Sequence, residues 1–203
     1  MLNKLFFEIN MTWKKVIIFA IGTAVFTAAI LIIPFTLHSS LGNIGTYLES
    51  WILFALIIII NCKKPLEAAL KTFVFFLISQ PLIYLLQVPF SYLGWQIFMF
   101  YKQWFLITLL TFPGAYIAWY VKKDNILSGI ILSVACSVLV GFGAYFVGSL
   151  IHNFPSNLLS VIYCYALAYL LIFVLLKNKK SRTVSLAITS LSAIAFLVIL
   201  VLR

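Results

Sequence analysis

Long apolar runs separated by short polar connections dominate the chain. Dividing the sequence at its charges and turn residues leaves seven apolar segments, each near the roughly 20 residues with which a helix crosses about 30 Å of hydrocarbon. The runs are continuously apolar instead of alternating with period two, which favours helices over barrel strands. The expected spans are residues 16–35, 44–61, 68–87, 104–121, 126–147, 157–176 and 183–202. The pattern predicts an all-α fold, a polytopic integral membrane bundle of about seven transmembrane helices.

The first fifteen residues have a different pattern. Apolar side chains recur there at helical spacing, at Leu2, Leu5, Phe6 and Ile9, and Trp13 follows near the expected membrane boundary. This spacing predicts a short amphipathic helix lying in the membrane interface. We therefore expect one membrane domain over residues 1–203, with an interfacial segment at 1–15 and the transmembrane bundle at 16–202.

The composition supports a lipid environment. Of the 203 residues, 65% are hydrophobic and 9% are charged, whereas soluble domains average about 25% charged residues. Fourteen basic and four acidic residues, 18 in all, cannot cover the surface of a soluble domain of this length.

The basic residues predict an orientation. Twelve of the fourteen fall at the amino terminus or beside every second connection, and Lys102 and Arg203 fall on the other side. The positive-inside rule then places the amino terminus in the cytoplasm and, with seven crossings, the carboxyl terminus outside. Merging or dropping any of the first six spans would disrupt this alternation. The last span is less constrained, because only Arg203 follows it.

The net charge of +10 does not indicate nucleic-acid binding. The basic residues form small groups beside apolar spans instead of one face interleaved with aromatics, so we expect contact with anionic lipid and no nucleic-acid partner. Lysine outnumbers arginine twelve to two, and isoleucine and phenylalanine are abundant. This bias suggests an AT-rich bacterial genome and hence a multi-pass protein of the plasma membrane.

One acidic residue, Glu49, lies near the start of the apolar stretch "GTYLESWILFALIIIINCKK". If the helix runs straight, twelve residues at about 1.5 Å each put Glu49 roughly 18 Å outward of Asn61. A carboxylate at that depth costs about 2.5–3.5 kcal/mol unless it is protonated, paired or hydrated. If the span instead begins near Tyr47, Glu49 is an interfacial residue with its carboxylate in water.

The third span offers polar partners at similar depth. Gln80, Tyr84 and Gln87 share one helical face by their spacing, and Pro81 frees a backbone carbonyl one turn earlier. With Glu49, these three side chains predict a small ligand-binding cavity open to the outside. Alternatively, the glutamines bond neighbouring helices and Tyr84 belongs to an interfacial aromatic belt.

Several spans carry small residues every fourth position. Ladders of this kind let helix backbones approach closely. They occur at Ala20, Ala24 and Ala28 in the first span, at Gly129, Ser133, Ser137 and Gly141 in the fifth, and the seventh span carries Ser185, Thr189 and Ser192. The hydroxyls of the seventh span could instead line a polar pathway or bond their own helix.

The segment "AIGTAVFTAA" around the alanine ladder resembles the substrate-binding subunits of energy-coupling-factor vitamin transporters. The resemblance covers about ten residues. It implies that the ladder docks against a transmembrane partner, in a family that usually has six spans where we count seven.

No catalytic constellation is evident. The sequence has no nucleophile-elbow serine, no HExxH and no glycine-rich phosphate loop, so we expect no enzyme activity. His38 and His152 fall in predicted external connections, and the three cysteines are far apart, so neither metal ligation nor a cofactor is expected.

Two function classes follow from these observations. The first is a protein that binds or translocates a small polar or cationic solute through an outward-facing cavity. The second is an accessory or assembly protein that packs against a membrane partner, which includes a transporter's substrate-binding subunit.

Overall fold

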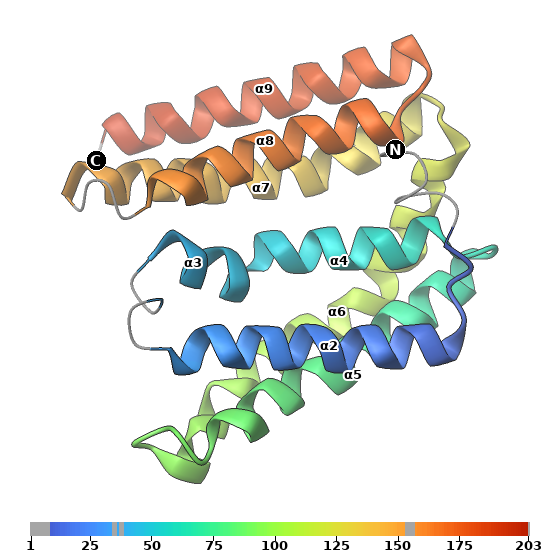
Figure 1. The fold of residues 1–203 in the computed structure, drawn as a ribbon. Coiled ribbons are helices and arrows are strands. Elements are labelled where there is room, and N and C mark those ends of the chain that lie inside the picture. Colours follow the sequence, from blue (N-terminus) through green and yellow to red (C-terminus); the bar gives the residue numbers. More distant parts are fainter. Residues whose placement is uncertain (1–8, 34–35, 37–38, 153–156, 203) are drawn as a thin grey trace. The chain divides into compact units, whose positions relative to one another are not determined.

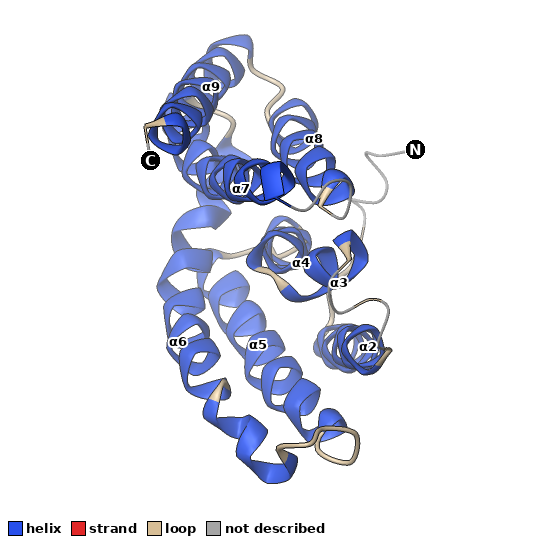
Figure 2. Ribbon diagram, turned by 90° about the vertical axis from the view of Figure 1, so that its left-hand side faces the viewer, coloured by secondary structure: helices blue, strands red, loops and turns tan. Residues whose placement is uncertain are grey.

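The computed structural model describes residues 9–33, 36, 39–152 and 157–202. Within these residues the regular structure consists of α-helices and two short 3₁₀ helices, with no strand (Figure 2). The predicted all-α fold is therefore confirmed for the described part of the chain. In order, the elements are α2 (Trp13–Ile32), α3 (Ser40–Thr46), α4 (Leu48–Ile60), α5 (Pro65–Gln87), η1 (Gly94–Met99), α6 (Tyr101–Ala118), η2 (Trp119–Lys123), α7 (Ile126–His152), α8 (Leu158–Leu175) and α9 (Lys179–Val201).

The long helices are apolar enough to cross a membrane. In the described residues, six stretches meet the length and hydropathy expected of a span: Trp13–Ile32, Pro65–Gln87, Gly94–Lys123, Ile126–Ile151, Leu158–Leu175 and Lys179–Val201. They coincide with six of the seven expected spans and indicate a multi-pass membrane protein. The other expected span is the pair α3 and α4, which bend by 45° at Tyr47. The count of seven and the cytoplasmic amino terminus stay predictions.

The described chain divides into two compact units. Unit 1 comprises residues 9–33, 36 and 53–119, and unit 2 comprises residues 39–52 and 120–202. Unit 1 contains α2, α5 and α6, and unit 2 contains α3, α7, α8 and α9 (Figure 1). The division falls within α4, whose residues 48–52 group with unit 2.

In unit 1, the alanine ladder of α2 lies inside the fold. Ala20, Ala24 and Ala28 are buried, and α2 packs against α5. The ring of Phe19 on α2 lies 5.1 Å from that of Phe75 on α5. Small side chains at every fourth position permit this close packing. The ladder is thus covered within its own chain, whereas the resemblance implies a surface that docks on a partner.

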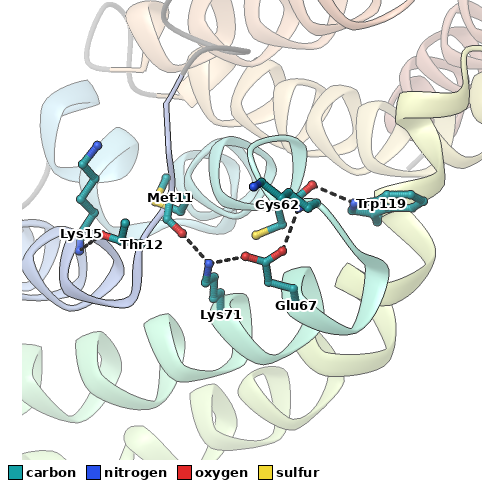
Figure 3. Close-up of polar contacts among 8 residues, drawn as sticks. Met11, Thr12, Lys15, Cys62, Glu67, Lys71 and Trp119 are labelled. Carbon is teal, nitrogen blue, oxygen red and sulfur yellow. Dashed lines mark hydrogen bonds and ion pairs between the residues drawn. The ribbon is translucent and has the colours of Figure 1, made fainter.

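The segment before α2 is fixed by a buried lysine of α5 (Figure 3). Lys71 is 5% exposed; its Nζ donates to the carbonyl of Met11 and pairs with Glu67. The Glu67 carboxylate also accepts from the backbone N–H of Lys63 at 2.8 Å. A buried ammonium needs such partners. The hydrogen bond from Lys71 to Met11 therefore holds the segment before α2 against α5.

The start of α2 differs from the expected one. The helix begins at Trp13, because the Thr12 hydroxyl caps it by accepting from the N–H of Lys15. Residues 13–15 therefore form the first turn of the candidate span, and the interfacial placement of residues 1–15 stays a prediction. Ile9 donates its N–H to Asn61 Oδ1. Leu2, Leu5 and Phe6 of the expected amphipathic helix lie outside the described residues.

In unit 2, α7 and α9 pack along two small-residue ladders. A Cβ added to Gly129 would lie 2.4 Å from the backbone oxygen of Ser181, so the backbones of α7 and α9 lie against each other there. Further along, the hydroxyls of Ser137 and Ser192 are 2.9 Å apart. The buried positions of α9 are Ser181, Ser185, Thr189 and Ala193. This spacing of four produces the close approach that the sequence indicates, and Figure 1 shows α7, α8 and α9 side by side.

Candidate functional site

α3 and α4 are separated by a break at Tyr47. Ser39 caps α3, its hydroxyl accepting from the N–H of Gly42 at 3.4 Å. Eight residues later the backbone becomes extended at Tyr47 (ψ 169°), whose N–H still donates to the carbonyl of Asn43. α4 then starts afresh at Leu48. The prediction of a helix that runs straight past Glu49 is therefore wrong, because the chain turns two residues before it.

Hydrogen bonds hold α3 against the ends of α7 and α8. Asn43 Nδ2 donates to Asn157 Oδ1 at 2.6 Å, and Asn157 Nδ2 donates to the hydroxyl of Ser149 at 2.7 Å. Ser160 on α8 donates to the carbonyl of Ser40 at 3.4 Å. Buried amides and hydroxyls with satisfied partners specify a single arrangement. The short helix is thus fixed within unit 2.

Glu49 is enclosed immediately after the break. Its side chain is 0% exposed, and neither carboxylate oxygen has a hydrogen-bond partner among the described residues. The alternative in which a late start of the span leaves the carboxylate in water is therefore wrong. The span does restart at Leu48, but protein atoms cover the acid on all sides.

Oxygen-bearing side chains surround this position. The hydroxyl of Ser50, the next residue, donates to the carbonyl of Ile44 in α3 and lies 3.1 Å from the hydroxyl of Tyr163 on α8. Glu49 lies within electrostatic range of Tyr163, Cys164 and Tyr47. The hydroxyls of Ser50 and Tyr163 and the carbonyl of Ile44 are thus linked by hydrogen bonds within unit 2, at the residue that follows Glu49.

The local structure compensates only part of the cost of a charge at Glu49. The residue lies in the first turn of α4, where the helix dipole stabilises a carboxylate by about 0.3–1 kcal/mol, and by up to about 2 when it is partly buried. Burying an unpaired carboxylate within a membrane costs about 2.5–3.5 kcal/mol on insertion scales. Since the cost exceeds the compensation, these surroundings favour the neutral, protonated form of the Glu49 side chain over an unpaired carboxylate.

The other three predicted site residues lie on α5 in unit 1. Gln80 is 2% exposed, and its Nε2 has no hydrogen-bond partner among the described residues. The half-buried Tyr84 contacts the rings of Phe98 and Tyr101. Glu49 belongs to unit 2, so one cavity lined by all four residues stays a prediction.

Gln87 lines a cavity of about 330 Å³ within unit 1, together with Leu31, Ile32, Phe90, Ser91, Tyr92 and Ile97. Its Nε2 donates to the carbonyl of Ile83 in the same helix at 3.1 Å, so the alternative in which the glutamines bond a neighbouring helix stays a prediction. α5 continues through Pro81 to Gln87. The missing N–H of that proline leaves the carbonyl of Leu77 without its helical donor.

Sequence reasoning missed the residues that build the surroundings of Glu49. Ser50, Tyr163, Asn43 and Asn157 become significant only because α3, α4 and α8 meet. The sequence does show Asn43 and Asn157 at the edges of apolar runs. Amides in such places need hydrogen-bond partners, which indicates a polar contact but not with which residue. Their pairing across 114 positions of sequence has no signature in a single chain.

The described residues contain no group of three histidine, cysteine or acidic side chains placed to hold a metal ion. Cys62, Cys136 and Cys164 are buried thiols. His38 lies outside the described residues.

Comparisons with protein-family models, curated proteins and solved structures find no match to this chain.

Proposed function

We propose that this multi-pass membrane protein binds, or moves across the membrane, a small cationic solute, and that Glu49 supplies the negative charge that holds it. The observation that carries the proposal is the carboxylate of Glu49, enclosed with both oxygens unpartnered at a helix break. Ionisable groups inside membrane segments are functional candidates by default, since they are expensive to keep.

The surroundings of Glu49 favour a cation with a single charge. Carboxylate, hydroxyl and carbonyl oxygens are ligands for hard cations, and broken helices supply such oxygens in transporters that bind Na⁺ or H⁺. Glu49 contributes one negative charge, which one monovalent cation balances. A divalent ion would leave an uncompensated charge in a dry site.

The proposal includes an outward-facing cavity in the plasma membrane, to which Gln80, Tyr84 and Gln87 contribute polar groups.

The alternative, an accessory protein that packs against a membrane partner, depends on small-residue ladders that are free to contact that partner. Ala20, Ala24 and Ala28 are buried in unit 1, and Gly129 packs on Ser181 in unit 2. We therefore favour the solute-binding function.

Neutralising the carboxylate tests the proposal. The purified protein is reconstituted in vesicles adsorbed on a solid-supported membrane, and charge displacement is recorded after concentration jumps of Na⁺, K⁺, H⁺ and methylammonium. We expect a response to at least one of these cations, and its loss in Glu49→Gln, which keeps the size of the side chain but cannot ionise.

Glu67→Gln is the matched control. It makes the same chemical change at the acid that pairs with Lys71 in unit 1, and we expect it to keep the response. A Glu49→Gln variant that inserts, folds and responds like the unaltered protein would exclude the proposal. A lack of response from the unaltered protein to all four cations would also exclude it.

A further inference from the structure

Two distant connections are joined at one end of unit 2 by Asp124. Asp124 Oδ2 accepts from the backbone N–H groups of Lys177, at 3.0 Å, and Asn178, at 2.7 Å. Its Oδ1 accepts from the hydroxyl of the buried Ser181 at 2.8 Å. The connection before α7 is thereby fixed to the connection between α8 and α9.

This junction gathers positive charge. The exposed lysines of the two connections and of the start of α9 are Lys122, Lys123, Lys177, Lys179 and Lys180. With Arg182 they carry six positive charges, and Asp124 removes one, which leaves a local net charge of +5. Both carboxylate oxygens of Asp124 accept from neutral donors. The aspartate thus organises the cluster while offsetting a small part of its charge.

The cluster lies where four candidate spans begin or end, and one of them, Gly94–Lys123, ends at a lysine of the cluster. α7 starts at Ile126, α8 ends at Leu175 and α9 starts at Lys179. Exposed apolar side chains come next along the spans: Ile126 is 53% exposed, Leu127 55% and Phe173 54%. Arg182 lies between the lysine cluster and these apolar side chains. Its guanidinium donates to the carbonyl of Leu176 and lies 5.5 Å from the centre of the Phe173 ring. Charge therefore borders directly on an apolar surface.

We propose that this junction is a binding site for the headgroup of an anionic phospholipid, whose phosphate contacts the lysines while its acyl chains lie along α7 and α8. Juxtamembrane lysines each contribute measurably to attraction by anionic lipid. The adjoining exposed side chains Ile126 and Leu127 continue along a candidate span, where acyl chains can cover them, whereas a nucleic acid has no apolar chain to place there.

A paired comparison separates a specific site from general attraction between charges. The first variant carries glutamine at Lys122, Lys123, Lys179 and Lys180. The control variant carries glutamine at four exposed lysines of unit 1, Lys14, Lys15, Lys63 and Lys64. Both variants lose four charges at the ends of spans, so any difference between them reports the arrangement of the cluster. A third variant with arginine at the four positions of the first keeps the charge.

The measurement is retention of phosphatidylglycerol over phosphatidylcholine by each full-length variant, read by native mass spectrometry after release from mixed-lipid nanodiscs. We expect the unit 2 glutamine variant to retain about tenfold less phosphatidylglycerol, with little change in the control and the arginine variants. Equal losses in both glutamine variants, or no loss in either, would overturn the proposal. Displacement of the lipid by inorganic phosphate or by a short oligonucleotide would also overturn it, because the ligand would then be a soluble polyanion.

Discussion

Replacing Glu49 by leucine should stabilise the cation-free protein while abolishing its response to cations. A buried polar group without a partner costs about 1–3 kcal/mol, and leucine of similar size removes that cost. For a chain of this size, each kcal/mol raises the melting temperature by about 2–4 °C. Thermal unfolding in detergent without added alkali cations measures the shift.

Asn157→Leu is the matched control in the same unit. Asn157 is also a buried polar residue, 8% exposed, but its amide bonds both Asn43 and Ser149. Leucine there leaves two partners unsatisfied, so we expect a loss of about 1–3 kcal/mol. If Glu49→Leu destabilises the protein as much as Asn157→Leu does, the carboxylate has a structural partner and the account of this site is wrong.

Replacing Gly129 by alanine should destabilise unit 2 strongly for a change of one methyl group. The added Cβ would lie 2.4 Å from the backbone oxygen of Ser181 and 3.1 Å from its carbonyl carbon. Backbone atoms cannot rotate away as a side chain can, so α7 and α9 must separate. Overpacking of this kind costs typically 1–3 kcal/mol. A lower melting temperature and a lower yield of monodisperse protein are expected.

Gly22→Ala is the control for that change. Gly22 lies on the exposed face of α2, and a Cβ there would meet nothing within 4 Å. Alanine is favoured over glycine in a helix by up to about 1 kcal/mol, so this variant should melt at the same or a higher temperature. If the two variants melt alike, α7 and α9 are not packed through Gly129.

The helices of this protein could be predicted because each span is one continuous run of apolar residues, which can be recognised without knowing the tertiary structure. An uninterrupted apolar run of about 20 residues has few alternatives in lipid, and five of the expected spans lie within four residues of their predicted bounds, whereas the span Gly94–Lys123 begins ten residues before the expected residue 104. The break at Tyr47 could not be predicted in the same way. Residues 40–46 are mostly small and polar, but they are helical, and together with residues 48–60 they have the hydropathy of one span.

The candidate site could be predicted only in part. Glu49 was identifiable because an acid among apolar residues is costly wherever it lies. Its neighbours were not, because Ser50 and Tyr163 are 113 positions apart and their contact depends on tertiary packing. Small residues at intervals of four likewise identified α7 as a packing helix, whereas the identity of its partner, α9, required the structure.

The central claim is that the buried carboxylate of Glu49 holds the cation, which competes with a proton for the same carboxylate oxygens. A hydrophobic carbodiimide reacts with protonated carboxyl groups in water-poor surroundings and leaves a stable N-acylurea, which mass spectrometry of peptides locates among the four acidic residues of the chain. Dicyclohexylcarbodiimide should modify Glu49, and the cation that evokes charge displacement should slow this reaction in proportion to its concentration. Modification of Glu49 at a rate that no tested cation changes would contradict the claim.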